Sequence, residues 1–239
     1  MEKVKQLKEM LDRAQKIVFF TGAGISVPSG IPDFRSASGL YKNDLRAEEI
    51  ISHHYFIKDP EDFYDFYKKK MCFPSALPNK AHKFIARLEK EGKVLAVITQ
   101  NIDGLHQKAG SKNVIELHGT IYKNHCVKCH ETYDLDYILN SDGIPYCKKC
   151  GGIIKPDVTL YEEPLDERAV YGTIDALMQA DLLIIIGTSL VVYPAASYID
   201  YYRNDDIVII NKGEIDTRRQ ATLVFDDDVI NVIKELEDV

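Results

Sequence analysis

Residues 94–106 read VLAVITQNIDGLH, and this stretch decides both the fold and the place of the functional site. Its first five residues form an apolar run of strand length, and polar side chains follow at once. Gln100, Asn101 and Asp103 therefore stand where a buried strand ends. His118 follows shortly afterwards in the segment ELHG. Because ligands of open α/β sheets bind outside the carboxyl ends of the strands, we expect these side chains to bind a ligand.

Apolar strands alternate with helical segments along the rest of the chain, which is typical of a parallel, doubly wound α/β sheet. The expected strands span 17–20, 94–98, 114–117, 182–186, 207–210 and 222–225. The expected helices span 2–15, 80–91, 167–179 and 228–236. Residues 36–80 are rich in aromatic and charged side chains and predict a small helical module. Its aromatic stripe is expected to fill a core, with the members Phe56, Phe63, Phe66 and Tyr67.

The length of 239 residues suits one large domain, or one that carries a smaller insert. The formal net charge of −7 argues against nonspecific nucleic-acid binding, which relies on basic side chains, and is compatible with a basic peptide partner. An effect on solubility alone is the preferred explanation of this mild acidity. No apolar run approaches the ~20 residues that span a bilayer, and no signal-peptide pattern is present at the N-terminus. We therefore expect a cytoplasmic protein with no membrane partner.

Four of the five cysteines form two knuckles, Cys126-x2-Cys129 and Cys147-x2-Cys150, separated by seventeen residues. This spacing brings four thiolates to one tetrahedral Zn²⁺ and leaves no coordination position open, so we predict a structural ion. A redox function is the alternative, although one such motif is enough for that chemistry. The knuckles interrupt the succession of strands, which indicates an insert. The fifth cysteine, Cys72, is expected to pack in a core.

Gly22-Ala23-Gly24 follows the first expected strand and favours a turn that binds a nucleotide phosphate. As a dinucleotide fingerprint it is incomplete, because Val27 stands where the third glycine belongs and no acidic residue ends a second strand. A plain tight turn is the alternative. Phe34 and Arg35 follow, and they pair an aromatic ring that can cover a flat base with a guanidinium that can hold phosphate.

Two later strand ends fit the same nucleotide site. Thr188 and Ser189 follow strand 182–186 and offer hydroxyls to a phosphate or a ribose, although a plain helix cap is the alternative. Asn211 follows strand 207–210, and its amide can bond ribose hydroxyls. The residue that reads the ribose would then lie on a different strand from the one in the usual fingerprint, which argues against an ordinary dehydrogenase.

Taken together, these segments resemble the sirtuins, the family of NAD-dependent protein-lysine deacylases. The matching segments occur in the family's order at 21–35, 99–110, 116–119, the four cysteines, 187–196 and Asn211. The resemblance implies a Rossmann-like large domain made of residues 1–35, 80–120 and 155–239. It also implies a small domain made of a helical module at 36–79 and a zinc module at 121–154, with an acetylated lysine peptide bound between the two domains.

The implied reaction transfers the acetyl group of acetyl-lysine to ADP-ribose and releases nicotinamide and O-acetyl-ADP-ribose. His118 would accept a proton from a ribose hydroxyl, a task that suits the pKa of an imidazole. Asp103 would accept a hydrogen bond from the nicotinamide amide. The implied catalytic residues are His118, Asn101 and Asp103. The implied NAD contacts are Ala23, Val27, Phe34, Arg35, Gln100, Ile102, Asp103, His118, Thr188, Ser189, Asn211 and Asp228.

The resemblance also implies that the peptide adds as a strand between residues 155–163 and 190–193, with Val158 against the acyl-lysine. Sirtuins usually carry Phe-Gly-Glu where this chain has Tyr161-Glu162-Glu163, and loss of the glycine changes the local backbone. The extra carboxylate favours basic peptides. The Tyr-x-x-Arg pair of the succinyl-specific members is absent from the sequence, so we expect short neutral acyl groups, acetyl first. A longer-chain deacylase, a mono-ADP-ribosyltransferase and a non-enzymatic NAD-sensing module are the alternatives.

Overall fold

The computed structural model describes residues 2–34, 39–40, 46–213, 215–217 and 219–239. Its main sheet has six strands in the order β3-β2-β1-β7-β8-β9, and neighbouring strands pair in parallel. The strands are β1 (Ile17–Thr21), β2 (Val94–Thr99), β3 (Val114–Glu116), β7 (Leu182–Ile186), β8 (Ile207–Ile210) and β9 (Leu223–Phe225). This is the strand order of dinucleotide-binding sheets, so the prediction of a doubly wound sheet is confirmed.

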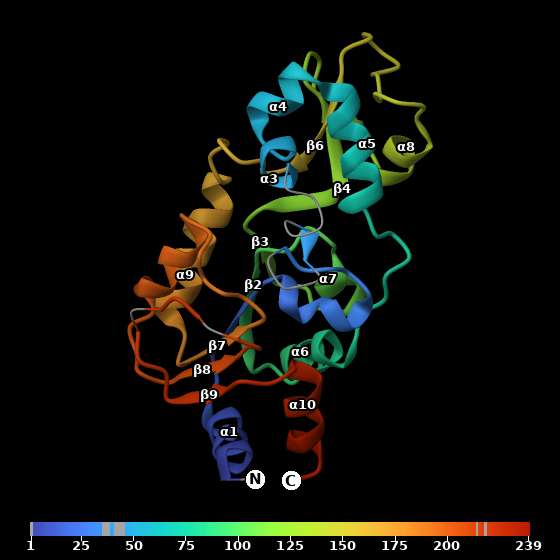
Figure 1. Cartoon of the computed structure of the whole chain (residues 1–239). Coiled ribbons are helices and arrows are strands. Elements are labelled where there is room, and N and C mark those ends of the chain that lie inside the picture. Colours follow the sequence, from blue (N-terminus) through green and yellow to red (C-terminus); the bar gives the residue numbers. More distant parts are fainter. Residues whose placement is uncertain (1, 35–38, 41–45, 214, 218) are drawn as a thin grey trace.

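Both faces of the main sheet are covered by helices, as Figure 1 shows. One face packs against α1 (Glu2–Arg13), α6 (Lys80–Lys90) and α10 (Val229–Glu237). The other face packs against α9 (Glu167–Gln179) and the 3-10 helix η3 (Ala195–Tyr201). Along β1, Ile17 and Phe19 point to the first face, whereas Val18 and Phe20 point to the second. Because neither face meets water, the strands read as continuous apolar runs in the sequence.

A second, antiparallel sheet with the strand order β5-β4-β6 lies beyond the carboxyl ends of the main sheet (Figure 1). Its strands are β4 (Gly119–Cys126), β5 (Thr132–Tyr133) and β6 (Ile154–Val158). The helices beside it are α3 (Ala47–Ile50), α4 (His53–Lys58), α5 (Pro60–Lys70) and α8 (Leu135–Asn140). One core joins this helical module to the cysteine-bearing segment, and it includes Phe63 and Tyr67 of the expected aromatic stripe. Among the described helices, none is long and apolar enough to cross a membrane.

The small sheet uses more of the chain than the sequence indicated. Strand β4 begins at Gly119, two residues before the expected start of the zinc module at 121, and β6 continues to Val158, beyond the expected end of that module at 154. Gly119 pairs with Val158 across the two strands. Pro156 weakens the strand pattern of this segment, but proline is tolerated because β6 lies at the edge of its sheet. The division into a large and a small domain stays a prediction, with residues 119–120 and 155–158 assigned to the small sheet.

Two buried histidines contact each other beneath the polar stretch. The rings of His82 on α6 and His106 on α7 (Leu105–Ala109) meet edge to face, with their centroids 4.8 Å apart. Within the described residues, neither ring nitrogen of His82 has a hydrogen-bond partner. Burial lowers the pKa of His82 to about 4, and burial also lowers the pKa of His106 well below its usual value. Both imidazoles are therefore neutral in the folded protein at neutral pH.

We expect the free energy of unfolding to fall as the pH drops from about 6.5 towards 4, because only the unfolded chain binds protons on these imidazoles in that range. Between pH 6.5 and 5, the free energy of unfolding of the His82→Leu variant should fall by about 2 kcal/mol less than that of the parent, since leucine does not titrate. Urea unfolding at both pH values measures this difference, with a variant of the exposed His54 (His54→Gln) as control. Equal pH dependence in His82→Leu and the parent would contradict the prediction.

Candidate functional site

The polar stretch after β2 lies beside the ends of β1 and β7, where the strand order of the main sheet reverses. Hydrogen bonds join the three strand ends. The Gln100 backbone N–H donates to the Thr21 carbonyl at 2.9 Å, and the Gln100 side-chain amide donates to the Thr188 hydroxyl at 3.1 Å. Ligands of such sheets bind at this reversal point, so the fold places Gln100 and its neighbours where a nucleotide is expected.

The glycine turn after β1 crosses the loop after β7 at very short range. The Gly24 N–H donates to the Gly187 carbonyl at 2.8 Å. A Cβ atom on Gly24 would lie 2.6 Å from the Gly187 Cα, and one on Gly22 would lie 2.7 Å from the Thr188 Cβ. The crossing of the two loops by itself requires glycine at both positions, a reason that the sequence pattern did not disclose.

Ser26 connects two side chains that are expected to bind the ligand, the carboxylate of Asp103 and the amide of Asn101. Its hydroxyl donates to Asp103 Oδ2 at 2.7 Å and accepts a hydrogen bond from Asn101 Nδ2 at 3.2 Å. Asn101 Nδ2 also donates to the Gly22 carbonyl at 3.0 Å. The sequence reasoning missed Ser26, because serine in a turn is common and its burial is visible only in the structure.

The Asp103 carboxylate is buried and already accepts two hydrogen bonds, one from Ser26 and one from the Leu105 N–H at 2.9 Å. Burial raises its pKa above the usual value, while these two hydrogen bonds act in the opposite direction. A carboxylate offers about four lone-pair positions, so Asp103 keeps acceptor capacity for a further donor such as a carboxamide.

His118 is oriented by one hydrogen bond that fixes its tautomer. Its Nδ1 lies 2.9 Å from the backbone carbonyl oxygen of Gln100. This oxygen can only accept a hydrogen bond, so Nδ1 carries the proton. Nε2 is then the unprotonated nitrogen. Burial lowers the pKa of His118, and the bond to Gln100 opposes this shift. The ring is therefore neutral at pH 7 and can accept a proton at Nε2.

Two cavities meet at this histidine. The sheet-end cavity is lined by 22–24, 187–189, 210–212 and 227–229 at the ends of the main strands. The inter-sheet cavity is lined by 158–163, 192–194, Ser26, Ile102 and Asp103, among others. The lining residues that both cavities share are Ala23, Phe34, Gln100, Asn101, His118 and Val192. A nucleotide in one cavity and a second substrate in the other would therefore meet beside His118.

The four cysteines of the two knuckles come together at one end of the small sheet. Their Sγ atoms all lie within 4.8 Å of one another, and the Cys126–Cys150 and Cys129–Cys147 pairs are 3.4 and 3.6 Å apart. Zn–S bonds of about 2.3 Å in a tetrahedron place sulfur atoms about 3.8 Å apart, so the arrangement fits one Zn²⁺. The Tyr133 hydroxyl donates to Cys147 Sγ at 3.2 Å, an outer hydrogen bond of the kind that steadies metal ligands.

Comparisons of the sequence and of the fold relate this chain to known proteins. The sequence model of the Sir2 family matches residues 22–194. The chain belongs to the Sir2 family. It is 52% identical to an NAD-dependent protein deacetylase of Clostridium perfringens over 99% of each chain. A Sir2 structure with a deacetylated p53 peptide and 3′-O-acetyl-ADP-ribose has a TM-score of 0.90 at 40% identity, and one with a p53 peptide and NAD⁺ has 0.88 at 39%. Each of these two structural comparisons covers 98% of both chains.

Membership of the Sir2 family was expected from the motifs, and the structure brings most of the expected site residues together. The sheet-end cavity is lined by Ala23, Val27, Phe34, Gln100, His118, Thr188, Ser189, Asn211 and Asp228. Ile102 and Asp103 line the inter-sheet cavity only. Arg35 lies outside the described residues. Lys212 and Asp227 also line the sheet-end cavity and were not expected, although both directly adjoin expected residues.

Several of the expected Sir2 contacts have a structural task as well. The Thr188 hydroxyl accepts hydrogen bonds from Gln100 and from the Leu190 N–H, and the Asn211 amide donates to the Gly213 carbonyl at 3.1 Å. Asp228 caps α10, since its Oδ1 accepts from the Ile230 N–H at 2.8 Å. These side chains therefore hold the walls of the cavity in place.

Proposed function

We propose that this chain is an NAD-dependent protein-lysine deacetylase, which transfers the acetyl group of acetyl-lysine to ADP-ribose. The observation that carries the proposal is the position of His118, a neutral base at the junction of two cavities. The deacetylase names of relatives at 48–52% identity support it. The four cysteines hold a structural Zn²⁺, because four thiolates leave no position for a substrate.

The sheet-end cavity would hold the dinucleotide, and the nicotinamide end would reach Asp103 between Ile102 and Phe34. NAD supplies the ribose carbon that the acyl oxygen attacks as nicotinamide leaves. Asn101 and Gln100 would hold the ribose hydroxyls and a water molecule. His118 Nε2 would then take the proton of a ribose hydroxyl. The oxygen of that hydroxyl would add to the acyl carbon. Water completes the reaction and yields lysine, nicotinamide and O-acetyl-ADP-ribose.

The acylated peptide would enter the inter-sheet cavity as an added strand. Support comes from the lining, because residues 158–163 and 192–194 both line this cavity. Val158 is buried there and would contact the acyl-lysine stem. We further propose that the protein acts in the cytoplasm and does not bind membranes directly. It would not bind nucleic acid directly either, and the net charge of −7 supports this last point.

A longer-chain deacylase is the second candidate, and one observation favours it. Beside Lys70, the helical module lines the inter-sheet cavity with an apolar wall of Ile51, Met71 and Phe73. Such a wall accepts additional methylene groups without leaving a polar group unpaired. We nevertheless expect acetyl to be the preferred group.

Incubation with an acetyl-lysine peptide should release nicotinamide and deacetylated peptide only when NAD is present. Mass spectrometry should detect O-acetyl-ADP-ribose in an amount equal to the nicotinamide. Butanoyl and octanoyl peptides in the same assay measure the chain-length preference. Deacetylation without NAD, or ADP-ribose attached to protein as the main product, would refute the proposal. No nicotinamide release at all would favour the NAD-sensing alternative.

A further inference from the structure

Glu162 has a backbone conformation that usually requires glycine. Its φ angle is +74°, in the left-handed region that glutamate rarely adopts. The side chain compensates with a hydrogen bond, since its Oε2 accepts from the His54 N–H in α4 at 2.9 Å. The residue is therefore held in one place rather than free to turn, and it lies in the wall of the inter-sheet cavity.

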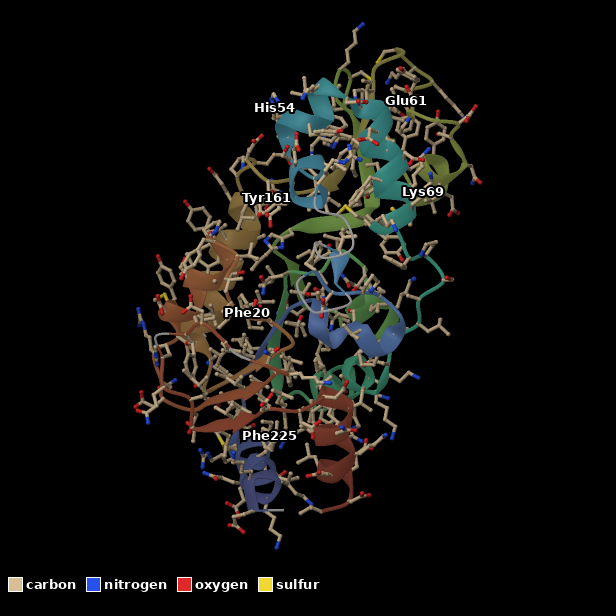
Figure 2. All side chains as sticks on the ribbon, viewed as in Figure 1. Phe20, His54, Glu61, Lys69, Tyr161 and Phe225 are labelled. Carbon is tan, nitrogen blue, oxygen red and sulfur yellow. The ribbon has the colours of Figure 1, made fainter. Side chains whose placement is uncertain are left out.

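The segment around Glu162 is anchored to the helical module on its outer side. The Tyr161 N–H donates to the Ile51 carbonyl at 3.1 Å, and the Tyr161 carbonyl accepts from the His53 N–H at 3.0 Å. Figure 2 shows Tyr161 and His54 on the same flank of the molecule. This pairing fixes the cavity wall before any peptide arrives.

The neighbouring carboxylate, Glu163, is neutralised within the protein. Its Oε2 lies 2.9 Å from Lys155 Nζ, and its Oε1 lies 2.7 Å from His53 Nδ1. These partners, with a hydrogen bond from the Leu160 N–H, hold the pKa of Glu163 below its usual value although burial opposes them. Its charge is thus already satisfied and is not offered to a ligand.

Glu162, in contrast, is exposed, and no cation forms an ion pair with it among the described residues. Residues 192–194, which also line this cavity, carry no charge. Within the described lining the only lysine or arginine is Lys70, on α5. The side of the cavity at residues 158–163 therefore presents one fixed, uncompensated negative charge.

We propose that Glu162 makes the enzyme prefer acetyl-lysine peptides that carry a lysine or arginine beside the acetyl-lysine. This inference rests on the proposed deacetylase function. A basic side chain next to the modified lysine would approach the free carboxylate oxygen of Glu162, whereas an acidic one would be repelled. Exposed ion pairs are weak, so we expect a preference of about two- to fivefold rather than strict selection.

The test compares acetyl peptides that differ only in one flanking residue, arginine or glutamate, placed before or after the acetyl-lysine. On one side, kcat/KM for the arginine peptide should exceed that for the glutamate peptide by about two- to fivefold at low ionic strength. Added salt should shrink this ratio, because the groups are exposed. Equal kcat/KM values for both peptides on both sides would overturn the proposal.

The Glu162→Gln variant isolates the charge, because glutamine keeps both the shape and an oxygen for the His54 N–H. It should abolish the preference, and Glu162→Lys should reverse it. The Glu162→Gly variant relieves the left-handed backbone and should also lose the preference, so a folding defect in one variant does not end the test. Glu167→Gln is the matched control, an exposed carboxylate five residues away that does not line the cavity, and it should keep the ratio.

Failure of this proposal differs from failure of the proposed function. If no peptide is deacetylated in the presence of NAD, the deacetylase function is wrong. If the peptides are deacetylated and the arginine-to-glutamate ratio in Glu162→Gln equals that of the parent, only the selection by Glu162 is wrong.

Discussion

Replacing His118 with alanine should lower kcat for acetyl-peptide deacetylation by about 10²- to 10⁴-fold, the usual contribution of a positioned general base. The reason lies in the tautomer, because Nδ1 donates to the Gln100 carbonyl and leaves Nε2 as the proton acceptor. NAD binding should weaken little, since His118 is only one of many residues that line the sheet-end cavity. Calorimetric titration with NAD and steady-state kinetics measure the two effects separately.

Alanine also leaves the Gln100 carbonyl without its donor, so a second variant is needed. In His118→Asn the side-chain amide can replace Nδ1 as donor but supplies no base. We expect the same loss of kcat with the unfolding free energy of the parent largely kept. Substantial deacetylation in both variants would show that His118 is not the base.

The pH profile gives an independent test of the same group. Because burial lowers the pKa of His118, its neutral form persists below the ordinary imidazole pKa of about 6.5. The acid limb of kcat/KM should therefore lie below pH 6.5 in the parent, and the residual activity of His118→Asn should lack this limb.

The main sheet could be predicted from the sequence because its signals are local. The run at 182–186 and the helix expected at 167–179 coincide with β7 and α9, since their signals lie within their own residues, and the structure adds Asp166 as the N-cap of α9. Strand β6 is different, because Pro156 interrupts its pattern and its pairing with β4 depends on residues 28 to 39 positions away. Length and register of such an edge strand follow from tertiary contacts rather than from its own composition.

The candidate site shows the same limit. The motifs gave the identity of Asn101, Asp103 and His118, but not the hydrogen bonds that set their states. Ser26 and the Gly24–Gly187 crossing join strand ends that are far apart in sequence. Position along the chain predicts which residues share a sheet edge, whereas protonation and orientation depend on partners that only the folded chain brings together.

Removing the zinc ion should have the largest effect on stability, and it should abolish deacetylation without any change at the catalytic residues. Cys126 and Cys147 are buried in the same core as Phe63, Tyr64 and Ile154, so the metal and this core support each other. Structural zinc sites of this kind contribute about 10 kcal/mol or more to folding. Strand β6 leads directly into 158–163, which line the inter-sheet cavity, so its loss would remove the wall that binds the peptide.

We therefore expect one zinc per chain in the purified protein, and loss of peptide turnover after treatment with a strong chelator. Limited proteolysis should then cut within 119–158, while the main sheet, whose cores are separate, should resist. Cys147→Ser should reproduce this result, because serine is a poor zinc ligand. Cys72→Ala is the control, since Cys72 is buried in the same core but outside the quartet, and it should keep its zinc. Full peptide turnover in a metal-free chain would show that the four thiols hold the core together without an ion.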